Sequence, residues 1–160
     1  MGEVAQVIVE SCLVTPSSET PSKALRPSPL DLLQANRGHT PLVQFYRPPS
    51  GGVDAATDFF DVARLKAALG KALVHFYPFA GRLNVDKEDG SLQISCNGEG
   101  ALFLVVHNSQ LAVDDFSDFK PSSELRRLLV PRIQSPEDAR ILAHIQVYMS
   151  FLFLPVSTSK

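Results

Sequence analysis

Histidine is the side chain best suited to act as a general base near neutral pH, and this chain of 160 residues has four of them. Such a base could take a proton from a hydroxyl or an amine during group transfer. None of the four histidines begins the pattern H-x-x-x-D, because no Asp stands four positions further on. The residues four positions after His39, His75, His107 and His144 are Val43, Phe79, Leu111 and Tyr148.

His75 adjoins an aromatic segment and is the best single candidate for a base. A partly buried histidine is more often structural, so we assign no catalytic residue in this chain. No G-x-S-x-G segment indicates a serine hydrolase. No spacing of His or Cys suits zinc, so we assign no metal ligand either.

The bulk composition predicts one globular domain that binds neither nucleic acid nor a membrane. Hydrophobic residues make up 44% of the chain and charged residues 20%, which argues against disorder. A net charge of -2 and a pI near 6.1 offer no basic surface for nucleic acid. No apolar run is long enough for a transmembrane helix, and the N-terminus lacks the basic region of a secretory signal. We therefore expect a cytoplasmic protein with Cys12 and Cys96 reduced.

The element that must position any site is a predicted amphipathic helix over residues 58–74. Apolar residues recur along it at steps of three and four, which places Val62, Leu65, Leu69 and Leu73 on one face. Asp58 is the expected N-cap. Asp61, three residues later, adds a carboxylate near the positive end of the helix dipole.

The helix must end in the aromatic segment that follows it, residues 76–83. Pro78 has no backbone N–H, and it pushes Tyr77 away from helical dihedrals. Gly81 allows a sharp turn or a close approach to other backbone, and the aromatic rings anchor the turn in a core. The sequence therefore predicts a helix, an aromatic turn and the start of a strand.

Strands are expected elsewhere in the chain from alternating apolar and β-branched residues, over residues 4–11, 41–47, 92–96, 101–106 and 141–153. Residues 86–90 predict a hairpin turn, and residues 16–29 predict a loop. Short helices are expected over residues 30–35, capped by Ser28, and over residues 123–129, capped by Ser122 or Ser123. The pattern predicts an α/β fold in which the helix over residues 58–74 backs a mixed sheet.

Residues 71–83, KALVHFYPFAGRL, resemble the hallmark turn of the plant BAHD acyltransferases, which use acyl-CoA thioesters. Residues 28–31, 41–47 and 96–103 resemble segments of the same family. The resemblance implies part of the first domain of a two-domain architecture like that of chloramphenicol acetyltransferase. It also implies that residues 1–148 form an incomplete N-terminal BAHD-like domain, and that residues 149–160 are a divergent tail.

The resemblance further implies transfer of a hydroxycinnamoyl or similar group from acyl-CoA to a hydroxyl or amine acceptor. Acyl-CoA is then a co-substrate, and no cofactor is expected. Leu42 and Gln44 match positions that line the acyl pocket, where hydroxycinnamoyl-transferring members commonly carry Ser and Tyr. Tyr77, Pro78, Gly81 and Arg82 match the structural turn.

Two motifs of the BAHD family are missing from this chain: the H-x-x-x-D that supplies the base, and a D-F-G-W-G, which the chain lacks because it has no Trp. We therefore expect the chain alone to be inactive. The alternative is a non-catalytic interaction protein that docks on a full-length relative or another partner.

The predicted strand over residues 141–153 has one apolar face, which in a complete family member should be covered by later segments. We expect self-association through this strand, because several large side chains stand on that face: Ile145, Val147, Met149, Phe151 and Phe153.

Overall fold

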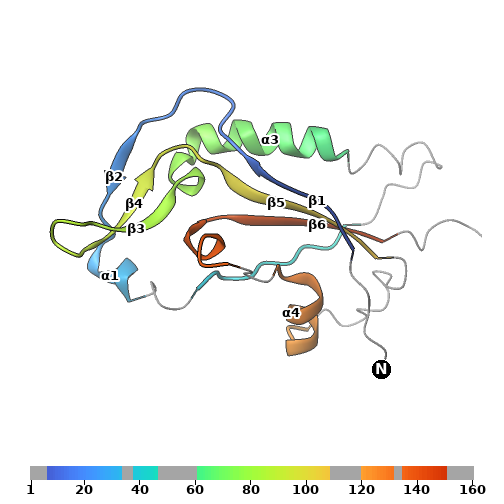
Figure 1. Ribbon diagram of the computed structural model, residues 1–160. Coiled ribbons are helices and arrows are strands. Elements are labelled where there is room, and N and C mark those ends of the chain that lie inside the picture. The colour runs from blue at the N-terminus through green and yellow to red at the C-terminus, as the bar shows by residue number, and fades with distance from the viewer. Residues whose placement is uncertain (1–6, 34–37, 47–60, 109–119, 132–134, 151–160) are drawn as a thin grey trace, which may run out of the picture.

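A computed structural model describes residues 7–33, 38–46, 61–108, 120–131 and 135–150. Its main sheet contains three strands in the order β1-β5-β6, with β5 in the centre (Figure 1). β1 pairs antiparallel with β5, and β5 pairs parallel with β6. The predicted α/β fold with a mixed sheet is therefore confirmed. The strands are β1 (Val7–Val14), β5 (Ala101–Asn108) and β6 (His144–Ser150).

β5 is the centre of the core because it is apolar on both faces. Phe103, Leu104, Val105 and Val106 are all buried, as expected for a strand that is covered on both sides. The flanking strands differ from their predicted bounds within the described residues. β1 runs three residues beyond the predicted end at residue 11, and β6 begins three residues after the predicted start at residue 141. Residues 4–6 and 151–153 of the predicted strands lie outside the described residues.

The register of the sheet separates its two faces. Ala101 lies in the core with Leu73 of the long helix, and Val14 and Ala143 pack against them. One position further on, Leu102 pairs with His144, and these side chains point to the opposite face because neighbouring residues alternate. Figure 1 shows the long helix α3 on one side of the sheet and the short helix α4 on the other.

Helix α3 (Val62–His75) begins later than the sequence predicts. Asp61 is its N-cap: the backbone of Asp61 is extended, with ψ 114°, and its side chain accepts a hydrogen bond from the Arg64 N–H. The expected cap, Asp58, lies outside the described residues. The predicted N-cap was wrong. Asp58 and Asp61 are equally suitable caps by residue type, and the sequence does not reveal that the backbone is extended at Asp61.

A second sheet lies beside the aromatic turn, with antiparallel strands in the order β2-β4-β3. The predicted hairpin turn is confirmed: the Asp86 N–H donates to the Ser91 carbonyl, and Gly90 has a φ of +71°. One strand lies inside the region predicted to be a loop, because its order depends on pairing with a distant strand. The three strands are β2 (Lys23–Leu25), β3 (Arg82–Val85) and β4 (Leu92–Cys96).

The strand predicted over residues 41–47 is not formed in the part that the structure describes, residues 41–46. Pro41 has no N–H to donate, and no strand ladder forms along the segment. His39 connects it to the start of β6, since its Nε2 lies 2.5 Å from the Ile141 carbonyl oxygen. The segment therefore lies against the main sheet without adding a strand to it.

The short helices form where local caps predict them. Ser28 and Asp31 form a reciprocal capping box at the start of α1 (Pro29–Leu32). The Ser122 hydroxyl accepts a hydrogen bond from the Leu125 N–H and caps α4 (Ser123–Leu129). Two short 3₁₀ segments complete the described part, η2 (Tyr77–Ala80) and η4 (Asp138–Arg140). Among the helices in these ranges, none is both long and apolar enough to cross a bilayer.

Candidate functional site

The aromatic turn is a tightly packed junction between α3 and β3. The Phe76 N–H still donates to the Ala72 carbonyl, and the Gly81 N–H then donates to the Pro78 carbonyl at 3.0 Å. Gly81 has no room for a side chain, because a Cβ there would overlap the backbone carbonyl of Ser95. The predicted close approach of backbone at Gly81 is therefore present.

The buried side chain of Arg82 holds this junction together. The residue is only 6% exposed. Its Nη1 donates to the carbonyl oxygens of Gly81 and Gly100 at 2.8 and 2.7 Å, and its Nε lies 3.0 Å from Glu99 Oε2. All three contacts are to the protein itself, so the guanidinium holds the loop between β4 and β5 against the turn.

Backbone contacts extend the junction to β1. The Gly100 N–H donates to the Ala80 carbonyl at 2.9 Å. Gly100 has a φ of +106°, and a Cβ there would lie 2.6 Å from the Val14 carbonyl oxygen. Tyr77 lies on the other side, with Lys23 Nζ at 5.7 Å from its ring centroid. The matched motif residues thus make contacts that support the fold.

His39 and His144 are brought together although they lie far apart in sequence. Their rings are stacked, with centroids 4.2 Å apart and an interplanar angle of 26°. His39 Nε2 lies 2.5 Å from the Ile141 carbonyl oxygen, and His144 Nε2 lies 3.1 Å from the Asp138 carbonyl oxygen. Sequence reasoning missed this pair, because no local spacing links its two members.

The surroundings of His144 disfavour its charged form. Burial is the main cause of a pKa below the usual value, and the nearby His39 and Arg82 act in the same direction. The carbonyl and charge of Asp138 oppose them without cancelling the effect. Among the other histidines, His75 is exposed at the C-terminal end of α3 and His107 is half-buried in β5. His75 lies far in sequence from the stacked pair and does not take part in it.

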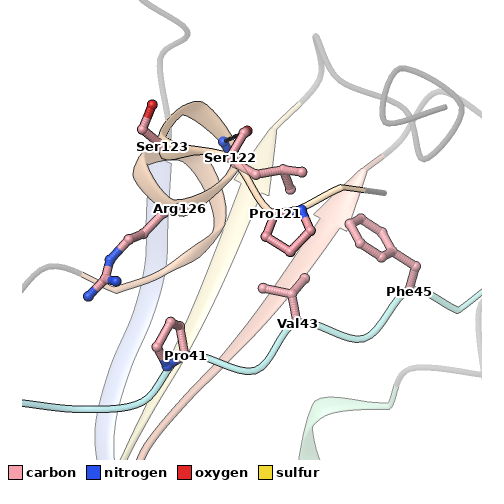
Figure 2. Close-up of a pocket in the computed structure, with 8 residues that line it drawn as sticks. Pro41, Val43, Phe45, Pro121, Ser122, Ser123 and Arg126 are labelled. Atoms are coloured by element: carbon pink, nitrogen blue, oxygen red, sulfur yellow. Dashed lines mark hydrogen bonds between the residues drawn. The ribbon is translucent and has the colours of Figure 1, made fainter. Parts of the chain in front are cut away.

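A shallow groove of about 410 Å³ lies between residues 38–46 and the start of α4. Figure 2 shows Pro41, Val43 and Phe45 pointing from the extended segment towards α4. The opposite wall consists of Pro121, Ser122, Ser123, Leu125 and Arg126. Its lining is mostly apolar, with two serines and one guanidinium, so it could hold an apolar group but offers no side chain that could act as a general base.

Leu42 and Gln44, the predicted acyl-pocket residues, do not line this groove. They alternate with Pro41, Val43 and Phe45 along an extended segment, and Leu42 is 82% exposed. The Tyr46 hydroxyl donates to Gln44 Oε1 at 2.5 Å. The role of Leu42 and Gln44 in binding an acyl group stays a prediction. Within the described ranges, no three His, Cys, Asp or Glu side chains lie close enough to share a metal ion.

Comparisons relate this chain to known transferases. A family model described as "Transferase family" matches residues 6–149. The hydroxycinnamoyltransferase of Narcissus pseudonarcissus is 50% identical over 131 residues, which are 82% of this chain and 28% of that protein. The putrescine hydroxycinnamoyltransferase 1 of Oryza sativa subsp. japonica is 49% identical over 144 residues, which are 90% of this chain and 31% of that protein.

A solved structure shares the fold as well. The crystal structure of vinorine synthase matches with a TM-score of 0.62 and 26% sequence identity, over 92% of this chain and 35% of that chain. The chain therefore spans about a third of the length of these proteins.

Proposed function

Because this chain belongs to the Transferase family, the family of the BAHD acyltransferases, we propose that it forms the N-terminal part of an acyl-CoA-dependent acyltransferase. The group transferred is a hydroxycinnamoyl or similar acyl group, and the acceptor is a hydroxyl or an amine. The observation that carries this proposal is the 50% identity to a hydroxycinnamoyltransferase over 131 residues. Acyl-CoA serves as a co-substrate, without a resident cofactor.

The segment over residues 38–46 is the part of the chain that we assign to the acyl group. One side of it lines the groove beside α4 with Pro41, Val43 and Phe45. Leu42 and Gln44 lie outside this groove and are exposed, which supports a role for them in contacting a ligand.

These 160 residues do not complete the reaction alone. A general base contributes about a hundredfold to ten-thousandfold to such a transfer, and no histidine of this sequence begins H-x-x-x-D. His39 and His144 each use Nε2 on a backbone carbonyl. We place the reaction in the cytoplasm, which agrees with free thiols at Cys12 and Cys96.

A chimera tests the proposal. Residues 6–149 replace the matching segment of the hydroxycinnamoyltransferase of Narcissus pseudonarcissus. We expect the chimera to form product from a hydroxycinnamoyl-CoA with an acceptor of the parent enzyme, measured by mass spectrometry, and the 160-residue chain to form none. A folded chimera without turnover contradicts the acyltransferase proposal. Turnover by the chain alone that is lost in His75→Ala would contradict the absence of a base.

A second candidate is a non-catalytic interaction protein. It is favoured by the position of β6, which pairs only with β5 among the described strands and so offers an edge for another strand. On this hypothesis the purified chain self-associates in size-exclusion chromatography, and Val147→Lys reduces the association. A monomer at high concentration that captures no relative would contradict it.

A further inference from the structure

The stacked histidines connect two parts of the chain that lie far apart in sequence. His39 lies in the segment over residues 38–46, and His144 is the first residue of β6. Their rings are 4.2 Å apart. The carbonyls that they contact belong to Ile141 and Asp138, so both rings are held over the turn that leads into β6.

The hydrogen bonding of the pair fits neutral rings. A carbonyl can only accept, so each Nε2 carries the proton and each Nδ1 keeps a lone pair. His39 Nδ1 is buried and has no hydrogen-bond partner in the structure.

The charged groups near the pair also affect whether the His144 ring can carry a positive charge. Arg82 on β3 bridges to Ile141, and its guanidinium disfavours the charged form of His144. Glu99 partly offsets that charge, because it is ion-paired with Arg82. On η4, Asp138 favours the charged form of His144. Arg140, also on η4, is a cation that donates a hydrogen bond to the Leu83 carbonyl. Two protonated rings at stacking distance would add direct repulsion.

We propose that His39 and His144 form an acid-sensitive clasp. The neutral, stacked rings hold residues 38–46 against the main sheet, and a proton on the His144 ring separates the rings and releases the segment. The groove beside α4 loses one wall when the clasp opens, because Pro41, Val43 and Phe45 belong to the released segment. The proposal does not depend on catalysis, since it concerns only how this segment is held.

The direction of the pH dependence follows from the environment of His144. Its pKa is held below the usual value mainly by burial, so the open state binds a proton more readily than the closed state. The clasp is therefore fully closed above about pH 6.5, the ordinary pKa of histidine, and weakens as the pH falls below it. For a single proton, the opening equilibrium rises up to about tenfold between pH 7.5 and pH 5.5.

A tryptophan reporter tests the clasp, because the chain has no Trp of its own. In Phe45→Trp, the indole would lie in the groove against α4. We expect its emission to shift to longer wavelength and its quenching by acrylamide to rise as the pH falls from 7.5 to 5.5. Far-UV circular dichroism of the same samples should stay constant, since the two sheets persist.

Three further variants in the Phe45→Trp background separate the clasp from other titrations. His144→Phe keeps a ring but cannot take a proton, and His144→Gln keeps a donor for the Asp138 carbonyl. Both should abolish the acid-induced change, whereas His75→Gln, at the exposed end of α3, should retain it. If either folded His144 variant keeps the change, or the Phe45→Trp chain shows none, the clasp is overturned. It is equally overturned if the circular dichroism signal is lost at the same pH, because the transition is then global unfolding.

Discussion

The aromatic turn and the segment over residues 38–46 both carry motif residues, but they are held in opposite ways. The turn is fixed by backbone contacts and by a buried guanidinium, with Arg82 bonded to two carbonyls and to Glu99. Residues 41–46 form no strand ladder, and His39, just before them, contacts β6 through its stacked ring and also contacts the Ile141 carbonyl.

This difference shows that the hallmark turn, residues 71–83, stabilises the fold. Gly81 and Gly100 are required because other backbone lies against them, and no ligand is needed to explain either residue. The segment over residues 38–46 has mostly exposed side chains and no strand pairing, which is typical of regions that meet a ligand. Three sets of substitutions can break or sharpen this contrast.

The largest effect is expected at Gly81. In Gly81→Ala, the new Cβ would overlap the Ser95 carbonyl, and backbone cannot move aside as a flexible side chain could. We expect a loss of about 3 kcal/mol or more in the free energy of unfolding, measured by urea denaturation. Gly90→Ala is the matched control: nothing lies within 4 Å of its Cβ position, and only its φ of +71° is strained. That control should lose about 1 kcal/mol. Equal losses would show that the turn is not closely packed.

An intermediate effect is expected at Arg82. Arg82→Met keeps much of the side-chain volume but leaves the carbonyls of Gly81 and Gly100 without this donor. We expect a loss of about 2 to 3 kcal/mol in thermal or urea unfolding. Glu99→Gln removes only the charge of a carboxylate that is 54% exposed, and should cost less than about 1 kcal/mol. A larger loss for Glu99→Gln than for Arg82→Met would show that the ion pair, and not the hydrogen bonds to the two carbonyls, stabilises the junction.

The smallest effect is expected on the exposed side of residues 38–46. Leu42→Ser and Gln44→Tyr should each change the free energy of unfolding by less than about 0.5 kcal/mol, because these side chains are exposed. Phe45→Ala, at the half-buried residue on the groove side, should cost about 1 to 2 kcal/mol. If the exposed substitutions cost as much as Phe45→Ala, both sides of the segment are structural, and the proposed role in acyl binding loses its support.

Local signals were enough to predict much of the fold. The capping box of Ser28 and Asp31, the cap at Ser122 and the turn at Gly90 each depend on residues within a few positions of one another. β5 was also predictable, because a continuous apolar run of this length favours a buried strand.

Features that depend on distant partners were not predictable. β2 is a strand only because Lys23 and Leu25 pair with β4, some seventy positions later. Residues 41–47 have the composition of a strand, but no strand edge pairs with the described part of this segment. His39 lies 102 positions from Ile141, whose carbonyl it contacts. The candidate site was therefore only partly predictable. The sequence indicated the segment over residues 41–47, but not the contacts of His39 with Ile141 and His144.

The pairing of β1 with β5 has a consequence for how the chain folds during synthesis. Val7 lies opposite His107, which is 100 positions later in the chain. At roughly 5 to 20 residues per second, the ribosome needs about 5 to 20 seconds to make the intervening chain. Val7 and Ile8 are synthesised well before β5, but they cannot pair until β5 has emerged. This strand order gives the chain a high contact order, and we expect slow folding with an early need for chaperones.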